Sequence, residues 1–355
     1  YNILTKAGFK VGAYLSPFVS VGTEKIQINH KFISIKNFIE LVEEIKPIIE
    51  KCHQTYGTPS YFEVLLLLAL KYFKKNKCTY VVLETGCGGR YDGTNAVYKT
   101  LVSIITNIGL DHTHILGKTI PKIAYEKSGI IRNKGQVFTT AEKISALQVI
   151  RKVCQEKKAK LNIIKSDQPN KALARAVTEH LKIKDKYILQ GLKSPKPLPA
   201  RFEIVQKNPM VILDGAHNPD KLNYLANMIQ DSSFKFQDLH LICALGQHKD
   251  IKDCFKNLME QVDYLYTTRP LMRFRKFQDP LGITKKLKSL TVKLGFKTQF
   301  NGVFLEPQMA FAAALRKAKK NDIILITGSF FLCSDLRKNW ISEEDQLEKR
   351  TNFLK

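Results

Sequence analysis

An apolar run that ends in a carboxylate and a glycine-rich loop is the strongest structural constraint in this chain of 355 residues. Residues 80–83 form the run, and Glu84 and the glycine-rich stretch 85–95 follow directly. We expect a buried strand that opens into a metal and phosphate site, because such sites lie at the carboxyl edge of parallel sheets. Two further polar runs, 109–114 and 214–219, also follow apolar segments. Together the three runs indicate an enzyme that uses ATP.

Strand-like and helix-like segments alternate along both halves of the chain. In the first half the pattern predicts strands at 11–15, 80–83 and 101–107 and helices at 35–52, 61–73 and 120–128. In the second half it predicts strands at 211–213, 239–244, 264–267 and 323–327, with helices between them, such as 307–319. Alternation of this kind is typical of the α/β class, with a parallel sheet covered by helices on both faces.

A proline-rich segment separates the two halves. Three prolines fall within residues 195–199, which predicts a stiff, extended linker. The chain length also favours two domains over one. We therefore predict a first domain at 1–193, a linker at 194–200 and a second domain at 201–355.

The charge of the chain is strongly positive, with a formal net value of +25. A polyanion such as nucleic acid is one explanation. The lysines are scattered, however, and form no block of five or six like charges. We interpret them as the surface of an enzyme that attracts ATP and acidic small-molecule substrates, with no nucleic-acid partner.

Apolar runs and cysteines indicate the compartment. No apolar run approaches the roughly 20 residues of a membrane span, so we expect no membrane partner. The seven cysteines are dispersed and show no paired spacing, which predicts reduced thiols in the cytoplasm. Cys87 lies in the glycine-rich loop without an evident base partner, and we interpret it as a small loop filler.

Individual residues in and near these runs can be interpreted either as site residues or as residues with a local structural role. Glu84 is a candidate Mg²⁺ ligand, because Mg²⁺ prefers oxygen ligands, but it could equally be a capping carboxylate. His112 and His114 are either site residues or hydrogen-bonded loop residues. Lys127 is expected near the end of a helix, where a lysine ordinarily complements the helix dipole.

The residues of the third polar run, 214–219, also have more than one interpretation. Asp214 could hold a ribose hydroxyl or cap a turn, and His217 could approach a phosphate or the reacting carboxylate. Pro219 is expected to open the next helix. The Gly117-Lys118-Thr119 triplet is no phosphate loop, because His112 occupies the position where that loop requires glycine.

Taken together these runs resemble folylpolyglutamate synthase and dihydrofolate synthase, members of the Mur ligase superfamily. The similarity covers nearly the whole chain in order. Its motifs are Leu15-Ser16-Pro17, 24–29, 61–63, 84–95, 106–112, 126–130, 201–203, 214–219, 246–250 and Gly328-Ser329.

The resemblance implies a fold, a reaction and roles for particular residues. The fold is a P-loop-type ATPase domain followed by a smaller Rossmann-like domain, with ATP in the cleft. The reaction adds L-glutamate to folate, and to dihydropteroate in some members, through an acyl phosphate. The implied cofactors are ATP and Mg²⁺, with K⁺ as a candidate second cation, and the implied protein is a monomer.

The implied site has four parts. Glu84 and His112 would ligate Mg²⁺ together with Lys127, carried as a carbamate. Arg201, Asp214, His217 and Asn95 would bind ATP. Lys127, His217 and Arg201 would act in catalysis. The pterin would contact Ser16, Arg90, Asp92 and Gly93.

The chain departs from the family pattern at three places. The GTNGKGS-type phosphate loop would lie before Tyr1, and residues 1–7 read as the tail of its helix, stopped by Gly8. Phe18 and Gly93 stand where the family usually has histidine and alanine. An inactive pterin- or nucleotide-binding remnant is therefore the alternative to an active ligase.

Overall fold

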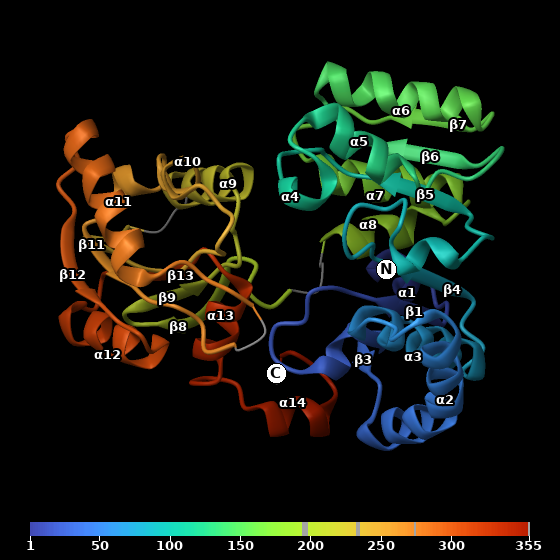
Figure 1. Cartoon of the computed structure of the whole chain (residues 1–355), viewed down its shortest axis with the longest axis horizontal. Helices are drawn as coiled ribbons and strands as arrows, with labels where there is room; N and C mark the ends of the chain where they lie inside the picture. Colours follow the sequence, from blue (N-terminus) through green and yellow to red (C-terminus); the bar gives the residue numbers. More distant parts are fainter. Residues whose placement is uncertain (194–197, 232–234, 273–274, 354–355) are drawn as a thin grey trace. The chain divides into compact units, whose positions relative to one another are not determined.

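The computed structural model describes residues 1–193, 198–231, 235–272 and 275–353 (Figure 1). They fall into two compact units. Unit 1 contains the described residues of 1–18, 22–196 and 347–351, and unit 2 contains those of 19–21, 197–346 and 352–355. Of the predicted linker, residues 194–197 lie outside the described residues.

Unit 1 contains two sheets, and the first is mixed. Its strands are β1 (Val11–Tyr14), β2 (Ile26–Ile28), β3 (Lys31–Phe32) and β4 (Tyr80–Leu83), in the order β3-β2-β1-β4. The pair β1 and β4 is parallel, and the other pairs are antiparallel. Helices α2 (Ile35–Tyr56) and α3 (Tyr61–Lys75) pack on one face. Helices α1 (Asn2–Lys6) and α8 (Asp185–Lys193) pack on the other.

The second sheet of unit 1 is parallel. Its strands are β5 (Val102–Ile105), β6 (Gln136–Thr139) and β7 (Lys160–Ile163), in that order. Successive residues of β6 point to opposite faces. Val137 packs against α5 (Ile120–Ser128) and α6 (Ile144–Glu156), whereas Phe138 packs against α7 (Pro169–His180).

Two features of unit 1 differ from the sequence prediction. The strands form two sheets instead of one parallel sheet, and β2 and β3 add antiparallel pairing. The strands expected at 80–83 and 101–107, interpreted from their apolar residues as buried, are only partly buried: β5 buries Ser103 and Ile105, whereas no residue of β4 is fully buried. Each is an edge strand with a single strand neighbour, so Val81 is 41% exposed and Ile104 44% exposed. The second of these strands is also shorter, spanning Val102–Ile105.

Unit 2 is a six-stranded sheet covered on both faces. Its strands are β8 (Glu203–Lys207), β9 (Met210–Leu213), β10 (Leu239–Cys243), β11 (Tyr264–Thr267), β12 (Gln299–Val303) and β13 (Ile323–Thr327). They lie in the order β12-β11-β10-β13-β9-β8, parallel except for β8. One face packs against α9 (Pro219–Gln230), α10 (Ile251–Phe255) and α11 (Pro280–Leu294). The other packs against α12 (Pro307–Lys317) and α13 (Phe330–Arg337) (Figure 1).

Short helices and local signals complete the fold. The shorter helical segments are η1 (Gly22–Lys25), η2 (Gly93–Ala96), α4 (Thr113–Leu116), η3 (Met259–Gln261) and α14 (Glu343–Lys349). Gly8 adopts a left-handed φ of 86° after α1, and Pro219 occupies the first turn of α9, both as predicted. Among the described helices, none has the length and apolarity needed to cross a bilayer. Each of the seven cysteines, all within the described ranges, is a free thiol.

Candidate functional site

In unit 1 the carboxyl ends of β1 and β4 bring Ser16 and Glu84 together. The two strands are parallel neighbours, with Tyr14 opposite Leu83, so their following residues meet at one edge. The backbone N–H of Glu84 donates to the Tyr14 carbonyl at 2.9 Å, and the Ser16 N–H donates to Glu84 Oε2 at 2.6 Å. The Glu84 carboxylate is thus held at the strand ends, where the sequence predicted a metal ligand.

The glycine-rich loop after Glu84 is closed by Asp92. Its Oδ2 accepts from the N–H groups of Gly86 at 2.9 Å and Cys87 at 3.0 Å. Its Oδ1 accepts from the N–H of Thr94 at 3.0 Å and from the Thr94 hydroxyl at 2.6 Å. Four hydrogen bonds occupy the roughly four acceptor positions of a carboxylate. Asp92, predicted to lie near a pterin, therefore organises the loop itself.

The same loop packs against the C-terminal end of α5, which carries Lys127. The Arg90 N–H donates to the Glu126 carbonyl at 2.8 Å. A side chain at Gly89 would come within 2.9 Å of the Lys127 carbonyl oxygen, and one at Gly129 would overlap the Arg90 backbone. Both glycines are therefore required by close backbone approach. The packing brings Lys127 near the Cys87 thiol, whose pKa is raised by burial and partly lowered again by Lys127.

Arg90 and Asn95, both predicted binding residues, lie on this packed surface. The Arg90 guanidinium stacks on the Tyr125 ring at 3.8 Å and donates from Nη2 to the Tyr125 carbonyl at 3.3 Å. Asn95 Nδ2 donates to the Arg90 carbonyl at 2.9 Å, and Asn95 Oδ1 is buried without a hydrogen-bond partner among the described residues. Gly93 lies against Glu63, where a side-chain Cβ would come within 3.2 Å of Cγ.

A cavity of about 440 Å³ opens beside Arg90. Its lining comes from α4, α5 and the residues between them, including Leu116, Gly117, Tyr125 and Glu126. Because Tyr125 both lines the cavity and stacks on Arg90, the predicted pterin residue lies next to an open, partly apolar space.

His112 occupies a strained position at the start of α4. Its backbone is left-handed, with φ 49° and ψ 36°, which is uncommon for a residue other than glycine. The Asp111 side chain accepts from the His112 N–H at 2.9 Å, and the His112 carbonyl accepts from Leu116 at 2.8 Å. Strain of this kind motivates a functional hypothesis, and the metal-binding role of His112 stays a prediction.

Lys25 belongs to this region although no role was predicted for it from the sequence. Its side chain is only 5% exposed, and its ammonium lies over the rings of Tyr14 at 5.2 Å, Tyr61 at 5.7 Å and Phe62 at 5.0 Å. Burial lowers the pKa of Lys25, whereas the nearby carboxylates of Glu84 and Asp92 raise it. A buried cation therefore lies beside the predicted metal ligand. Lys25 lies within the 24–29 motif, but no role for it could be read from that motif, because its three rings come from two distant elements, β1 and α3.

In unit 2 the polar run after β9 meets the glycine turn after β13. The strands are parallel neighbours, and the Gly328 N–H donates to the Ala216 carbonyl at 2.9 Å. The Asp214 carboxylate accepts from the N–H of Phe202 and of Ala216, each at 2.8 Å. Burial raises the pKa of Asp214, and these hydrogen bonds and the nearby Arg201 partly lower it. The capping role expected as one alternative for Asp214 is thus present.

The exposed Arg201, the half-buried His217 and the buried Phe330 lie against one another in this region. The Arg201 guanidinium lies over the Phe330 ring at 4.1 Å, and the His217 ring meets the same ring edge-on at 5.6 Å. Gly215 permits this arrangement, because a side chain there would overlap Phe330. Three predicted residues, Arg201, Asp214 and His217, are therefore brought together. The sequence motif at Gly328-Ser329 ends one residue before Phe330, which was not predicted.

The hydrogen bonds of His217 define its tautomer. Nδ1 lies 2.7 Å from the Gly215 carbonyl, which accepts only, so Nδ1 carries the proton. Nε2 lies 3.4 Å from the Lys221 ammonium and is the acceptor. The unprotonated Nε2 is consequently paired with a cation at the start of α9.

Comparison with known proteins identifies both halves of the chain. Residues 25–202 match the Mur ligase middle domain, and residues 200–330 match the glutamate ligase domain of Mur ligases. Together the matched ranges contain the motifs from 61–63 to Gly328-Ser329.

Individual relatives narrow the family. The dihydrofolate synthase/folylpolyglutamate synthase of Bacillus subtilis is 30% identical over 95% of this chain and 85% of its own length. The Escherichia coli FolC structure with DHPP and ADP is 29% identical, with a TM-score of 0.81 over 95% of this chain and 83% of that one. The Yersinia pestis bifunctional enzyme with AMPPNP and Mn is 28% identical, with a TM-score of 0.80 over 95% and 84%. This chain belongs to the folylpolyglutamate and dihydrofolate synthase family of Mur ligases.

Proposed function

We propose that this chain is an ATP-dependent amide ligase that adds L-glutamate to a folate, and to dihydropteroate where it acts as a dihydrofolate synthase. The observation that carries this proposal is the Glu84 carboxylate held at the ends of β1 and β4, directly before the loop closed by Asp92. Family membership and the relatives with bound nucleotide support the same activity.

The reaction proceeds in two steps. An oxygen of the pteroyl or folyl carboxylate attacks the γ-phosphorus of ATP, and ADP leaves. The amine of glutamate then attacks the acyl carbon of the acyl phosphate, a proton is lost, and inorganic phosphate leaves as the amide forms. Positioning and charge stabilisation supply most of the catalysis in phosphoryl transfer.

Unit 1 would hold the metal and the phosphates. Glu84 offers a fixed carboxylate, the oxygen ligand that a hard dication prefers, and His112 would add an imidazole. Among the described residues no group of three or more His, Cys, Asp and Glu side chains that could hold a metal is found, so this ligand set rests on the family pattern. Lys127 would complete the set as a carbamate, which forms when its amine adds to CO₂ and releases a proton. A bound Mg²⁺ would neutralise charge on the phosphates during transfer. A K⁺ ion as a second cation is part of the same proposal.

Unit 2 would bind the nucleotide through Arg201, Asp214 and His217. The guanidinium of Arg201 supplies a fixed cation for phosphate oxygens. Asp214 would accept from a ribose hydroxyl, and His217 Nε2, beside Lys221, would face the reacting group. In unit 1, Asn95 would add an ATP contact. Ser16, Arg90, Asp92 and Gly93 would line the pterin site, supported by the cavity beside Arg90.

The domains, the location and the oligomeric state of the protein are also part of this proposal. The first domain would span 1–193 and the second 201–355, joined by the proline-rich linker 194–200. The free thiols support a reducing, cytoplasmic location. We propose a monomer whose positive charge attracts ATP and acidic substrates rather than nucleic acid.

Turnover with defined substrates tests the ligase. The protein is incubated with Mg²⁺, ATP, L-glutamate and either dihydropteroate or tetrahydrofolate. We expect one ADP for each product that gains a glutamyl residue, detected by mass spectrometry. A heavy-oxygen label in the substrate carboxylate should appear once in the released phosphate. Nucleotide binding without turnover would instead favour the inactive remnant.

A variant pair tests the metal role of Glu84. Glu84→Gln should lower kcat by about a hundredfold, equivalent to about 2.7 kcal/mol of transition-state stabilisation. Glu43→Gln, at an exposed position on α2, is the matched control and should leave kcat unchanged. Equal activity in the two variants would contradict the assignment of Glu84.

A further inference from the structure

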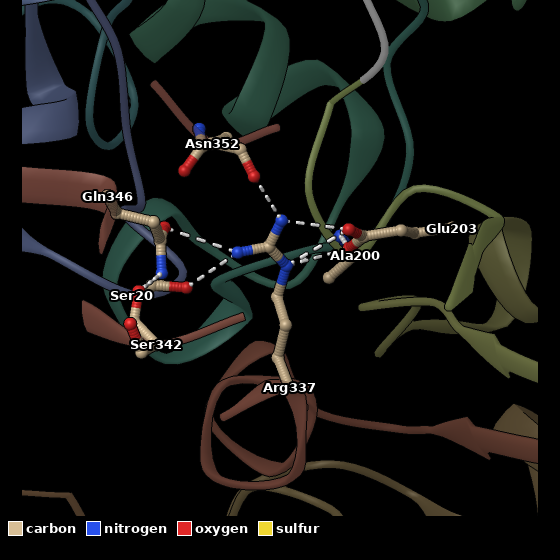
Figure 2. Close-up of polar contacts among 7 residues, drawn as sticks. All are labelled: Ser20, Ala200, Glu203, Arg337, Ser342, Gln346 and Asn352. Atoms are coloured by element: carbon tan, nitrogen blue, oxygen red, sulfur yellow. Dashed lines mark hydrogen bonds and ion pairs between the residues drawn. The ribbon is translucent and has the colours of Figure 1, made fainter. Parts of the chain in front are cut away.

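Arg337 is a fully buried arginine at the end of α13, and each of its five N–H groups has an acceptor (Figure 2). Nε donates to both carboxylate oxygens of Glu203 at 3.0 Å, and Nη2 donates to Glu203 Oε1 at 2.8 Å. Nη2 also donates to the Asn352 carbonyl at 2.7 Å. Nη1 donates to Ser20 Oγ at 3.0 Å and to Gln346 Oε1 at 3.2 Å. We call these five residues the Arg337 cluster.

The cluster joins parts of the chain that are far apart in sequence. Glu203 is 134 residues from Arg337, and Ser20 is 317 residues away. All five residues belong to unit 2. A buried charge is tolerated when it is paired and all its donors are satisfied, and both conditions hold here. The planar guanidinium of Arg337 also suits this buried position better than a lysine ammonium would, because its N–H groups match the two oxygens of a carboxylate.

Glu203 transmits this arrangement to the segment that carries Arg201. Its Oε2 accepts from the Ala200 N–H at 2.9 Å (Figure 2). The Ala200 carbonyl in turn accepts from the Gly215 N–H at 2.8 Å. The ion pair is therefore two hydrogen bonds away from the turn that follows β9.

The backbone around Arg201 needs such support. Ala200 has a φ of 51° and Phe202 a φ of 47°, so a left-handed residue that is not glycine lies on each side of Arg201. Conformations of this kind persist only where surrounding contacts hold them. The Glu203 carboxylate holds Ala200, and the Asp214 carboxylate holds Phe202 at 2.8 Å. Each neighbour of Arg201 is thus fixed by one carboxylate.

We propose that Arg337 is a positioning residue for nucleotide binding: acting through Glu203 and Ala200, it holds the strained backbone that presents the Arg201 guanidinium. This inference rests on the proposed role of Arg201 in binding ATP. Arg337 itself is fully buried and acts on the nucleotide through Arg201. Ser20, Gln346 and Asn352 complete its hydrogen bonds and so contribute to the same arrangement.

Kinetics of two folded variants test the proposal. Arg337→Lys keeps the charge but loses the fork, and Glu203→Gln keeps an acceptor but loses the charge. Each should raise KM for ATP on the order of tenfold, equivalent to about 1.4 kcal/mol, and leave KM for glutamate near the wild-type value. Adding the two changes together should cost less than the sum of their separate effects, because they act through one pair.

A stability control separates positioning from general destabilisation. Leu287→Ala removes a fully buried side chain of α11 in the core of unit 2. It should lower the unfolding temperature at least as much as Arg337→Lys does, while KM for ATP stays at the wild-type value. Arg316→Lys, at an exposed position on α12, should change neither quantity.

A measurement without substrate tests the backbone directly. Trypsin cleaves after arginine, so the rate of cleavage between Arg201 and Phe202 reports how well this segment is held. We expect faster cleavage at this bond in Arg337→Lys and Glu203→Gln, but not in Leu287→Ala. This readout works even if the protein is no ligase, so its failure and the failure of the proposed function are distinguishable.

The outcomes are decisive in both directions. A raised KM for ATP together with faster cleavage after Arg201 in both folded variants supports the positioning role. Wild-type KM and wild-type cleavage in both variants would overturn it, whatever their unfolding temperatures. If Arg337→Lys fails to fold, KM for ATP and cleavage after Arg201 are measured in Glu203→Gln and Gln346→Leu instead. Both of these variants keep the Arg337 guanidinium.

Discussion

The carboxylate of Asp92 accepts a hydrogen bond from the backbone N–H of Gly86 at 2.9 Å, across the glycine-rich loop that begins beside Glu84. Its second oxygen accepts from Thr94, so one side chain ties both arms of the loop. The placement of Glu84 and the shape of this loop are therefore coupled through a single carboxylate. Substitution of Asp92 should therefore disturb both the placement of Glu84 and the shape of the loop.

Asp92→Asn should destabilise the loop. The asparagine NH₂ group would face N–H donors that now bind oxygen, and leaving such donors unpaired costs about 1–3 kcal/mol. We expect a lower denaturation midpoint in urea and a raised KM for the pteroyl substrate. Asp167→Asn, at an exposed position, is the control and should change neither. An Asp92→Asn protein as stable and active as wild type would refute the loop-closing role.

Gly129→Ala should disturb the contact between the loop and α5. Gly129 has helical angles, φ −58° and ψ −22°, so alanine is acceptable to the backbone, but its Cβ would overlap the Arg90 backbone. Overpacking of this kind costs about 1–3 kcal/mol, and we expect a lower unfolding temperature. Gly246→Ala is a matched control, because no atom of the described residues, other than those of Gly246 and its two neighbours in the chain, lies within 4 Å of its Cβ position. Similar losses in both variants would argue against close packing as the cause.

Phe330→Leu should weaken ATP binding while leaving the fold intact. The variant removes the ring over which the Arg201 guanidinium lies at 4.1 Å. Loss of a cation–π contact of about 0.7 kcal/mol predicts a KM for ATP raised about threefold. Steady-state kinetics measure it. Phe331→Leu, one residue further on the same helix, tests specificity, and an equal change there would remove the support for a special role of Phe330.

His240 should make the stability of unit 2 sensitive to mild acid. The side chain is fully buried, stacked on Tyr264 at 4.5 Å and paired with Asp322 at 3.3 Å. Burial lowers its pKa below the ordinary value of 6.5, and Asp322 only partly offsets this. Below pH 6.5 the unfolded chain therefore binds a proton that the folded chain does not, so the free energy of unfolding falls as the pH drops.

Unfolding between pH 7 and pH 5 measures this dependence. Wild type should lose stability faster than His240→Gln over the window below 6.5, and the two should show parallel curves above it. His180→Gln, an exposed histidine of α7, is the control and should follow wild type. Parallel curves for His240→Gln and wild type throughout would mean that another group titrates.

Local patterns in the sequence predicted the elements but not their pairing. Two predictions that depend on neighbours in sequence were confirmed. One is the strand that ends before Glu84 and the Gly-rich stretch, and the other is the start of α9 at Pro219. Strand pairing is a long-range property, so the division into two sheets and the exposure of Val81 could not be derived from periodicity.

The same distinction applies to the candidate site. Glu84, Asp214 and His217 follow strands directly, and strand ends are where sites are sought. Lys25 lies in a helical turn and meets its three aromatic rings only in the folded unit. Arg337 resembles any basic residue at a helix end until Glu203, 134 residues away, is placed beside it. The roles of the predicted ligands of ATP, metal and pterin stay predictions.

The composition of the Arg337 cluster determines when unit 2 can be completed during synthesis. One contributor, Ser20, is made before most of unit 1, and the Asn352 carbonyl is added only after the whole six-stranded sheet. The guanidinium cannot find all its acceptors until residue 352 has left the ribosome. The hydrogen bonds of Arg337 are therefore completed only when an early and a late segment of the chain are both present in unit 2.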